Sequence, residues 1–420
     1  MISAPNFIEL NMAFTSRICR LNGSLFSTTR NYCFNCYSTL SQKDAKDSAP
    51  RTSITHPGQH NENHIGLWYT IEKQKFKSLF GNFDHNCATL NSHPVALPKT
   101  YMEFTEAFDE AALMIREPSL SAIKYIKQSD LSMLPNKFLL YGEVGNGKTL
   151  SLAHIIHFLS MDGWVIAHLQ WPVYYKKIFH KYQSIIEVTP SSTRPGKFDH
   201  PVAATAWLRH FQEQNSELLS KMDLKTTELH EWSKRENLPA GSPLSEIIEM
   251  GLTRSRASSD CVFALIKELK NLATAKEIKL AFVVDGLNAM FQPDVRDKAK
   301  EAGATPENFV IYDAFKQFFQ HDWTNGCIVG SVCQLASDKD WAETYFPRYL
   351  LGKEGWDAID PFVPIKVEPF NNSEFHSILD YLVENNWIHH QAINTVRGRK
   401  ELAAVTGKNG YDLIKFLDHL

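Results

Sequence analysis

The sequence predicts an α/β fold with a parallel central sheet. Three observations support this prediction: short apolar runs typical of buried parallel strands, amphipathic stretches between them, and a glycine-rich loop that joins a strand to a helix. The chain has 420 residues, of which 43% are hydrophobic. It can therefore bury a large core, either as one large domain with additions or as two domains.

Five apolar runs are predicted to be the strands of this sheet. They cover residues 138–141, 164–168, 280–284, 327–332 and 362–367. The run 280–284 is apolar throughout, as expected for a central strand that is covered on both faces. Helices are predicted between the runs, over 150–159 and 260–276, because apolar residues recur there at helical spacing.

The stretches around these elements complete a domain predicted over residues 101–368. Helical spacing over 101–127 predicts two helices divided at Pro118. Residues 174–258 are predicted to be a mostly helical insertion, interrupted by Pro- and Gly-containing loops at 189–201 and 238–243.

A C-terminal helical lid is predicted over residues 369–420. Apolar spacing predicts a helix over 374–384 and a terminal helix over 411–420. Ser373 is predicted as the N-cap of the first of these helices, because a serine hydroxyl can accept a hydrogen bond from a free backbone N–H.

The N-terminal residues differ from the rest of the chain. Residues 1–45 are rich in Ser, Thr and Asn, and Glu9 is their only acid before Asp44, against the basic residues Arg17, Arg20, Arg30 and Lys43. This composition predicts a mitochondrial transit peptide, which a membrane potential that is negative inside draws inward. An ordinary disordered N-terminus is the alternative. Residues 46–100 are predicted to be an extended segment that wraps over the domain, with an ordered part near 67–71.

Charge and cysteine usage exclude several classes of protein. The formal charge of −3 provides no global positive field for indiscriminate nucleic-acid binding, so any RNA contact has to be local. The seven cysteines are scattered, and the one close pair, Cys33 and Cys36, is followed by no second pair at metal-ligand spacing. They favour neither a disulfide framework nor a zinc site. No apolar run reaches about eighteen residues, so no membrane span is predicted.

A phosphate-binding loop matches the pattern G-x-x-x-x-G-K-[ST] in full, directly after a predicted strand and before a predicted helix. Glycines allow backbone N–H groups to surround a phosphate, and the helix N-terminus adds partial positive charge. Lys148 is expected to reach the β- and γ-phosphate oxygens, and the Thr149 hydroxyl to hold Mg²⁺. The predicted nucleotide-binding residues are Gly142, Glu143, Val144, Gly145, Asn146, Gly147, Lys148, Thr149 and Leu150.

An acidic residue at the end of a neighbouring buried strand completes the predicted metal site. Asp285 follows the run 280–284 and is expected to hold Mg²⁺ together with Thr149. The alternative is that Asp285 only caps the turn at Gly286. P-loop ATPases of the AAA type usually place a Glu after this Asp, whereas this chain has Gly286, so no general base is evident.

Two further features bear on the class of P-loop fold. Ser331 and Gln334 follow a predicted strand where a sensor of the γ-phosphate would lie, although they can equally satisfy backbone groups. The last strand passes into the lid. Together these features favour the additional-strand, AAA/STAND-like class. The chain lacks the Asn-Lys-x-Asp sequence of Ras-like proteins, so its spacing does not define a guanine site.

Several blocks of sequence resemble the death-associated protein 3 family, whose members are P-loop proteins of the mitochondrial small ribosomal subunit. The resemblance covers roughly residues 100–420. It is carried by the phosphate loop with its flanks and by the blocks 198–199, 207–208, 241–244, 284–289, 350–358, 360–362 and 381–387.

The resemblance implies a matrix protein in the head of the small subunit that binds GTP or GDP with Mg²⁺; the residues leave ATP open. Implied partners are small-subunit proteins, local rRNA and the large subunit across the intersubunit face. Family roles carry over for phosphate and metal binding to Gly142, Gly145, Gly147, Lys148, Thr149 and Asp285.

The favoured function is therefore a structural ribosomal protein that holds a nucleotide, with slow or absent hydrolysis. The first alternative is an active AAA-like mitochondrial ATPase, which would require a Glu beside Asp285 and an arginine finger. Arg254, Arg256 and Arg348 lie in no context typical of a finger. A P-loop kinase or transferase is the second alternative, and no acceptor-binding motif supports it.

Overall fold

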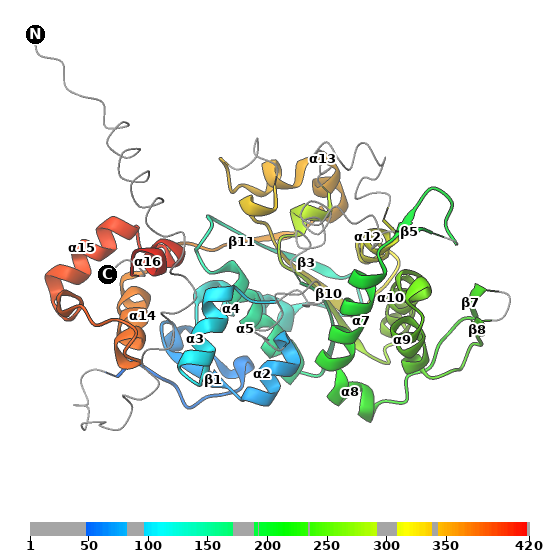
Figure 1. Ribbon diagram of the computed structural model, residues 1–420, viewed down its shortest axis with the longest axis horizontal. Helices are drawn as coiled ribbons and strands as arrows, with labels where there is room; N and C mark the ends of the chain where they lie inside the picture. The colour runs from blue at the N-terminus through cyan, green and yellow to red at the C-terminus, as the bar shows by residue number, and fades with distance from the viewer. Residues whose placement is uncertain are drawn as a thin grey trace, which may run out of the picture. The chain divides into compact units, whose positions relative to one another are not determined.

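The computed structural model describes residues 48–81, 96–170, 189–191, 193–233, 236–291, 309–337 and 343–417 (Figure 1). The predicted transit peptide, Cys33 and Cys36 lie outside these residues. From Ala49 onward the described residues belong to one unit. None of the helices in these ranges combines the length and the apolar character that crossing a membrane requires.

A five-stranded parallel sheet forms the centre of this unit. It consists of β3 (Asn136–Tyr141), β4 (Trp164–Leu169), β9 (Lys279–Val284), β10 (Gly326–Ser331) and β11 (Val363–Lys366). The spatial order is β11-β3-β10-β9-β4, and every neighbouring pair is parallel. All five predicted strands are confirmed to within two residues. Since β10 separates β3 from β9, the sheet has the added strand of the predicted P-loop class, and the fold class is confirmed.

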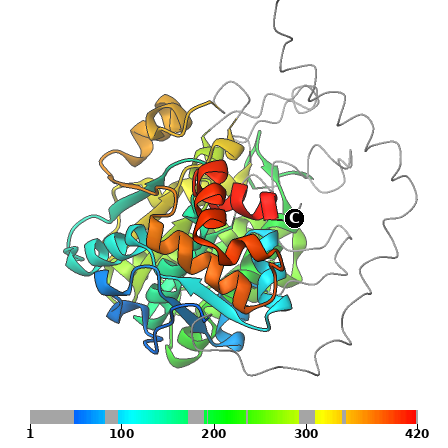
Figure 2. The same cartoon turned by 90° about the vertical axis from the view of Figure 1, so that its left-hand side faces the viewer.

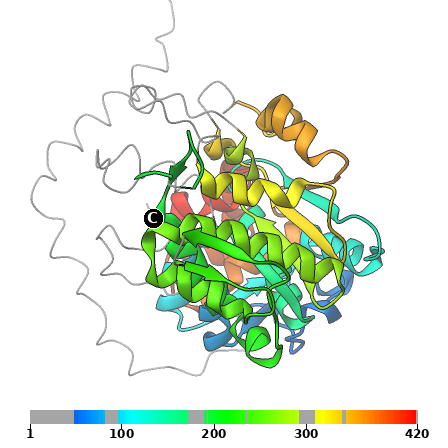
Figure 3. The same ribbon diagram turned by 90° about the vertical axis from the view of Figure 1, so that its right-hand side faces the viewer.

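Helices cover both faces of the sheet. Side chains alternate along β3, so that Leu139 joins one apolar cluster while Phe138 and Leu140 join another. The cluster with Leu139 contains side chains of α7 (Pro201–Gln214), α9 (Leu244–Thr253), α10 (Ser258–Thr274) and α12 (Val310–Lys316), which lie together in Figure 3. The other cluster contains side chains of α4 (Glu117–Gln128) and α5 (Lys148–Met161).

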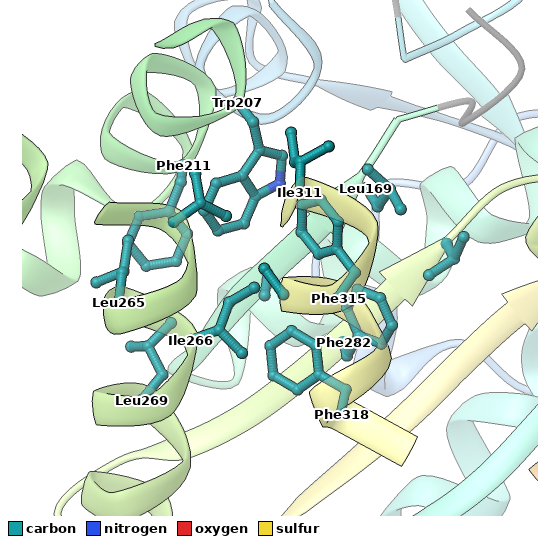
Figure 4. Close-up of a cluster of buried hydrophobic side chains, with 14 of the residues drawn as sticks. Leu169, Trp207, Phe211, Leu265, Ile266, Leu269, Phe282, Ile311, Phe315 and Phe318 are labelled. Atoms are coloured by element: carbon teal, nitrogen blue, oxygen red, sulfur yellow. The ribbon is translucent and has the colours of Figure 1, made fainter. Parts of the chain in front are cut away.

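Aromatic packing dominates the face covered by α7, α10 and α12. Figure 4 shows Phe282 of β9 directed toward Phe315 and Phe318. The Phe282 and Phe318 rings are stacked with their centroids 4.2 Å apart. Stacked pairs of this kind stabilise a core by about 0.5–1.5 kcal/mol beyond the burial of their area. This face of the sheet is therefore packed largely by aromatic rings.

The segment before the sheet corrects one prediction. Residues 111–114, predicted as helical, form strand β2 (Ala111–Met114), which pairs antiparallel with β1 (Trp68–Ile71). Helix α3 (Lys99–Ala107) ends because Asp109 adopts a left-handed φ of 53°. Pro118 does not divide two helices but lies in the first turn of α4, where its missing N–H leaves no bond unmade.

The remaining described elements extend from this core. Helix α2 (Lys73–Phe80) follows β1, and α8 (Ser216–Lys221) follows α7. The predicted helical insertion also contains two short hairpins, β5 (Thr189–Pro190) with β6 (Phe198–Asp199) and β7 (His230–Ser233) with β8 (Glu236–Leu238). Helix α13 (Pro347–Ile359) connects β10 to β11 and is kinked at Gly352.

The C-terminal region folds into α14 (Asn372–Glu384), α15 (Val396–Thr406) and α16 (Gly410–Leu417), drawn in orange to red in Figure 2. These helices share an apolar cluster. The predicted N-cap was wrong, because Asn371 and not Ser373 caps α14. The Asn371 side chain accepts from the Glu374 backbone N–H, and the Glu374 carboxylate accepts from the Asn371 N–H. This reciprocal capping box satisfies two N–H groups at once, whereas Ser373 already lies inside the helix.

Candidate functional site

The phosphate loop forms a tight turn between β3 and α5. Gly142, Gly145 and Gly147 adopt φ values of 149°, 89° and 89°, which side chains other than glycine rarely allow. A Cβ on Gly142 would lie 2.3 Å from the Val367 carbonyl oxygen. Gly147 is the left-handed N-cap of α5. Successive N–H groups in such a turn form an anion-binding concavity, so the backbone fits a phosphate group.

Lys148 is buried at the first turn of α5. Its Nζ donates to the Gly142 and Glu143 carbonyl oxygens at 2.8 and 2.7 Å. Burial lowers the pKa of Lys148, against the opposing charges of Cys333, Asp285 and Glu143. Among the described residues, the two carbonyls occupy two of the three N–H donors of the ammonium group. The arrangement leaves its third donor for a phosphate oxygen.

Thr149 and Asp285, the two predicted metal residues, lie together. The Thr149 hydroxyl donates to Asp285 Oδ2 at 2.7 Å. Asp285 is 6% exposed, and burial raises its pKa against hydrogen bonds from Ser331 and Thr149 and the charge of Lys148. Asp285 directly follows β9. A hydroxyl beside a carboxylate is the oxygen donor set that Mg²⁺ takes with a nucleotide. The pair therefore fits an Mg²⁺–nucleotide complex.

The Ser331 hydroxyl is hydrogen-bonded to Asp285 and to the backbone that follows it. Its hydroxyl donates to Asp285 Oδ1 and accepts from the Gly286 backbone N–H at 3.0 Å. The fully buried side chain thus uses both its donor and an acceptor within the protein. Gln334, the second candidate sensor, is half-buried at the start of a short 3-10 helix. Ser331 is accordingly a residue that orients the carboxylate.

The segment after Asp285 is fixed and carries no acid. Gly286 has a left-handed φ of 77° and opens the 3-10 helix Leu287–Met290. The Asn288 side chain donates to the Cys333 carbonyl at 3.0 Å and accepts from the Cys333 N–H at 2.9 Å. These two bonds join the segments that follow β9 and β10. No carboxylate occupies position 286, where a hydrolytic base would be expected.

The other predicted loop residues have supporting roles. Asn146 is buried, and its Nδ2 donates to the Val367 carbonyl at 2.9 Å. Val144 packs against a small apolar cluster that contains Ala289 and Cys333. Glu143 is exposed, and Leu150 is half-buried in α5.

The three candidate finger arginines lie elsewhere in the described chain. Arg254 pairs with Glu236 at 3.6 Å, and the Arg348 guanidinium lies 4.9 Å from the centroid of the Trp356 ring. Arg256 is exposed in a short 3-10 helix. Each of these contacts is typical of a surface arginine.

Sequence reasoning missed Arg116, which directly precedes α4. Its Nη1 donates to the Asn146 carbonyl at 2.5 Å, and its Nη2 donates to the Glu368 carbonyl at 3.0 Å and to the Glu374 carboxylate at 3.1 Å. The guanidinium also lies over the Phe370 ring. One side chain thus joins the phosphate loop, the end of β11 and α14. A single arginine outside the motif carries no spacing that predicts this role.

Asn409 was also missed. Its Nδ2 donates to the Val144 carbonyl at 2.7 Å and to Asn146 Oδ1 at 3.0 Å. Its Oδ1 accepts from the Tyr411 N–H at 2.9 Å, which caps α16. The Asn-Gly pair before the predicted terminal helix is an N-cap signal, but the sequence holds no signal for the contact with the loop.

Solved structures with a similar chain path include the replication initiator DnaA of Aquifex aeolicus bound to AMPPCP. The similarity has a TM-score of 0.27 and 13% identity, and covers 73% of this chain and 68% of that one. A crystal structure of a DNA replication initiation factor has a TM-score of 0.27 and 12% identity, with 72% and 65% coverage. These scores are too low to support any functional conclusion.

Sequence comparison is far more specific. The family model for mitochondrial ribosomal death-associated protein 3 matches residues 113–416. Small ribosomal subunit protein mS29 of Bos taurus is 34% identical, covering 86% of this chain and 85% of the relative. The mS29 protein of Mus musculus is 34% identical as well, with 92% and 95% coverage. The chain therefore belongs to the mitochondrial ribosomal death-associated protein 3 family, as its sequence motifs predicted.

Proposed function

We propose that this protein is a structural component of the mitochondrial small ribosomal subunit that holds a guanine nucleotide with Mg²⁺ and hydrolyses it slowly or not at all. Family membership makes it a mitochondrial, ribosome-associated protein, as predicted. The relatives of cattle and mouse are named small ribosomal subunit proteins, which supports the proposed place of this chain in that subunit.

One observation carries the nucleotide proposal: a complete phosphate site with no carboxylate directly after Asp285. Lys148, Thr149 and Asp285 lie together at the edge of the sheet. The bound Mg²⁺ would neutralise phosphate charge, and the chain's own groups would bind and orient the phosphates. Position 286 after the metal-binding Asp is a glycine, and it cannot polarise an attacking water.

The attachment of α14 supports a static protein over a motor that cycles. Trp68 of β1 stacks on Tyr381 of α14 with ring centroids 4.0 Å apart, and the Trp68 indole donates to the Ser377 hydroxyl at 3.0 Å. The Ala49 backbone N–H donates to the Glu384 carboxylate at 3.1 Å. Residues before the sheet therefore hold the first lid helix against the core. Domain closure in cycling enzymes requires a lid that can move as a body.

The choice of guanine follows from the family resemblance, and the residues themselves leave ATP open. We also propose contacts with small-subunit proteins, with nearby small-subunit rRNA and with the large subunit across the intersubunit face. A formal charge of −3 agrees with binding mainly through protein neighbours.

Residues 1–45 are proposed to be the import sequence that brings the chain into mitochondria, because they are basic and almost free of acids. N-terminal sequencing of protein isolated from mitochondria tests this. We expect a mature N-terminus beyond the early arginines, and an intact Met1 would refute the proposal.

The nucleotide proposal is tested with the purified chain. We expect guanine nucleotide to be released when the protein is denatured, and turnover of added GTP to be far below roughly 10 per second, the ordinary enzymatic scale. Lys148→Ala should release no nucleotide. Bound adenine nucleotide with fast turnover would instead support an AAA-like ATPase and would contradict the proposal.

A further inference from the structure

The phosphate loop is held by two side chains that lie outside the motif, Asn409 and Arg116. Asn409 Nδ2 donates to the Val144 carbonyl, and Arg116 Nη1 donates to the Asn146 carbonyl. In a planar trans peptide the C=O and the following N–H point in opposite directions. Anchoring these two carbonyls outward therefore turns the N–H groups of Gly145 and Gly147 toward the phosphate side.

Asn409 is itself held rigidly. The residue is 7% exposed, and both N–H donors of its side chain are used, by the Val144 carbonyl and by Asn146 Oδ1. Its carbonyl oxygen accepts from the Tyr411 and Asp412 N–H groups at 2.9 and 3.3 Å. Turning the amide over would place its oxygen against two other oxygens. The orientation that caps α16 is thus also the one that binds the loop.

The close approach of α16 depends on the loop conformation. A Cβ on Gly145 would lie 2.1 Å from Asn409 Oδ1 and 2.6 Å from Tyr411 Cβ. The backbone before α16 is also tied to the end of the sheet, because the Phe370 N–H donates to the Lys408 carbonyl at 3.0 Å. A loop that lost its turn would therefore lose the surface on which α16 is docked.

We propose that Asn409 is a positioning residue for the phosphate loop, so that nucleotide binding and the docking of α16 stabilise each other. This inference rests on the proposed nucleotide site. A nucleotide favours inward N–H groups, and the Asn409 contact favours the same conformation of the same peptide bonds. Coupling between two such events is reciprocal, so each must strengthen the other by the same factor.

The test uses Asn409→Asp in the full chain. Aspartate caps a helix as well as asparagine does, so α16 keeps its cap while both donors to the loop are lost. The probe is a fluorescent methylanthraniloyl derivative of GDP with Mg²⁺. We expect affinity to fall about tenfold or more, the scale of leaving a buried carbonyl without its donor. Asn61→Asp is the matched control, because Asn61 also caps a short helix through its side-chain oxygen; its affinity should stay within twofold of the parent.

Hydrogen exchange on the unmodified chain provides the reciprocal measurement. The probe should slow exchange of the α16 amides in the parent, and the slowing should be lost in Asn409→Asp. Two results would overturn the inference: α16 exchange in the parent that the probe does not change, or a folded Asn409→Asp protein that binds the probe as tightly as the parent. If Lys148→Ala abolishes binding in the same experiments, the proposed nucleotide site stands and only the inference fails. If the parent itself did not bind the probe, the proposed function would fail and the inference with it.

Discussion

Removal of the Glu374 carboxylate should destabilise the protein strongly. Glu374 and Arg116 are 3% and 7% exposed, and their charged atoms lie 3.1 Å apart. Glu374→Ala leaves a buried guanidinium without its counter-charge, and Arg116 Nε already has no hydrogen-bond partner among the described residues. Breaking a buried pair in this way costs about 3–5 kcal/mol. At roughly 2 °C per kcal/mol for a large domain, Tm should fall by about 6–10 °C.

Thermal unfolding followed by circular dichroism measures this effect, with urea unfolding as a second readout. Glu368→Ala is a matched control, since Glu368 forms an exposed pair with Lys366 and its loss should leave Tm unchanged. The double variant Arg116→Met with Glu374→Leu should recover only part of the lost stability, because neither charge is then buried alone but the Asn146 carbonyl loses its donor. A Glu374→Ala protein that melts with the parent would refute the view that this pair fixes α14 to the phosphate loop.

Two further predictions concern pH and the phosphate loop. Burial lowers the pKa of His157 to about 3, below its unfolded value of about 6.5, so its contribution is present above pH 6.5 and is lost on acidification. Between pH 7 and 5 the free energy of unfolding falls by about 2 kcal/mol through His157. Burial raises the pKa of Asp199 to about 6, so protonation of Asp199 stabilises the folded state by about 1 kcal/mol as the pH falls from 7 to 5. Further buried histidines with lowered pKa act in the direction of His157, namely His154, His168 and His200. Tm should therefore fall from pH 7 to 5, and a rise would contradict the burial of neutral histidines. Gly145→Ala should abolish binding of fluorescent GDP, whereas Gly163→Ala, with a φ of 73° but no atom within 4 Å of the new Cβ, should only lower stability. Equal effects of both alanines on binding would show that backbone strain and not contact with α16 matters.

The sheet and the phosphate loop were predictable because their signals are local. A parallel strand buried on both faces is apolar along its whole length, as the run 280–284 is, and a phosphate loop needs glycines at fixed positions. The strand order itself was not predicted; only the additional-strand class was, from the residues at the strand ends and from a last strand that passes into a lid.

Elements whose structure depends on distant partners were not predictable. Residues 111–114 suit a helix by spacing and become a strand only because β1 pairs with them. The N-cap error had a different cause, since Asn371 is followed three residues later by Glu374, a capping-box pattern that was present in the sequence and outweighs Ser373.

Arg116 and Asn409, which hold the phosphate loop, could not be predicted because their partners lie far away in the sequence. Arg116 and Glu374 are 258 positions apart, and Asn409 lies 265 positions from Val144. Contacts over such separations are created by the fold. The motif residues Lys148 and Thr149 could be assigned without it, because the glycine-rich motif fixes their positions in the loop.

One measurement tests directly whether the nucleotide is a permanent structural ligand of a ribosomal protein. Mitochondrial small subunits are separated on a sucrose gradient from cells that express either the parent chain or Lys148→Ala, and the nucleotide released on denaturation is quantified per chain. We predict that the parent co-sediments with the subunit and releases about one guanine nucleotide per chain, and that Lys148→Ala is depleted from the subunit. If Lys148→Ala entered the subunit as well as the parent while carrying no nucleotide, the structural role of the nucleotide would be contradicted.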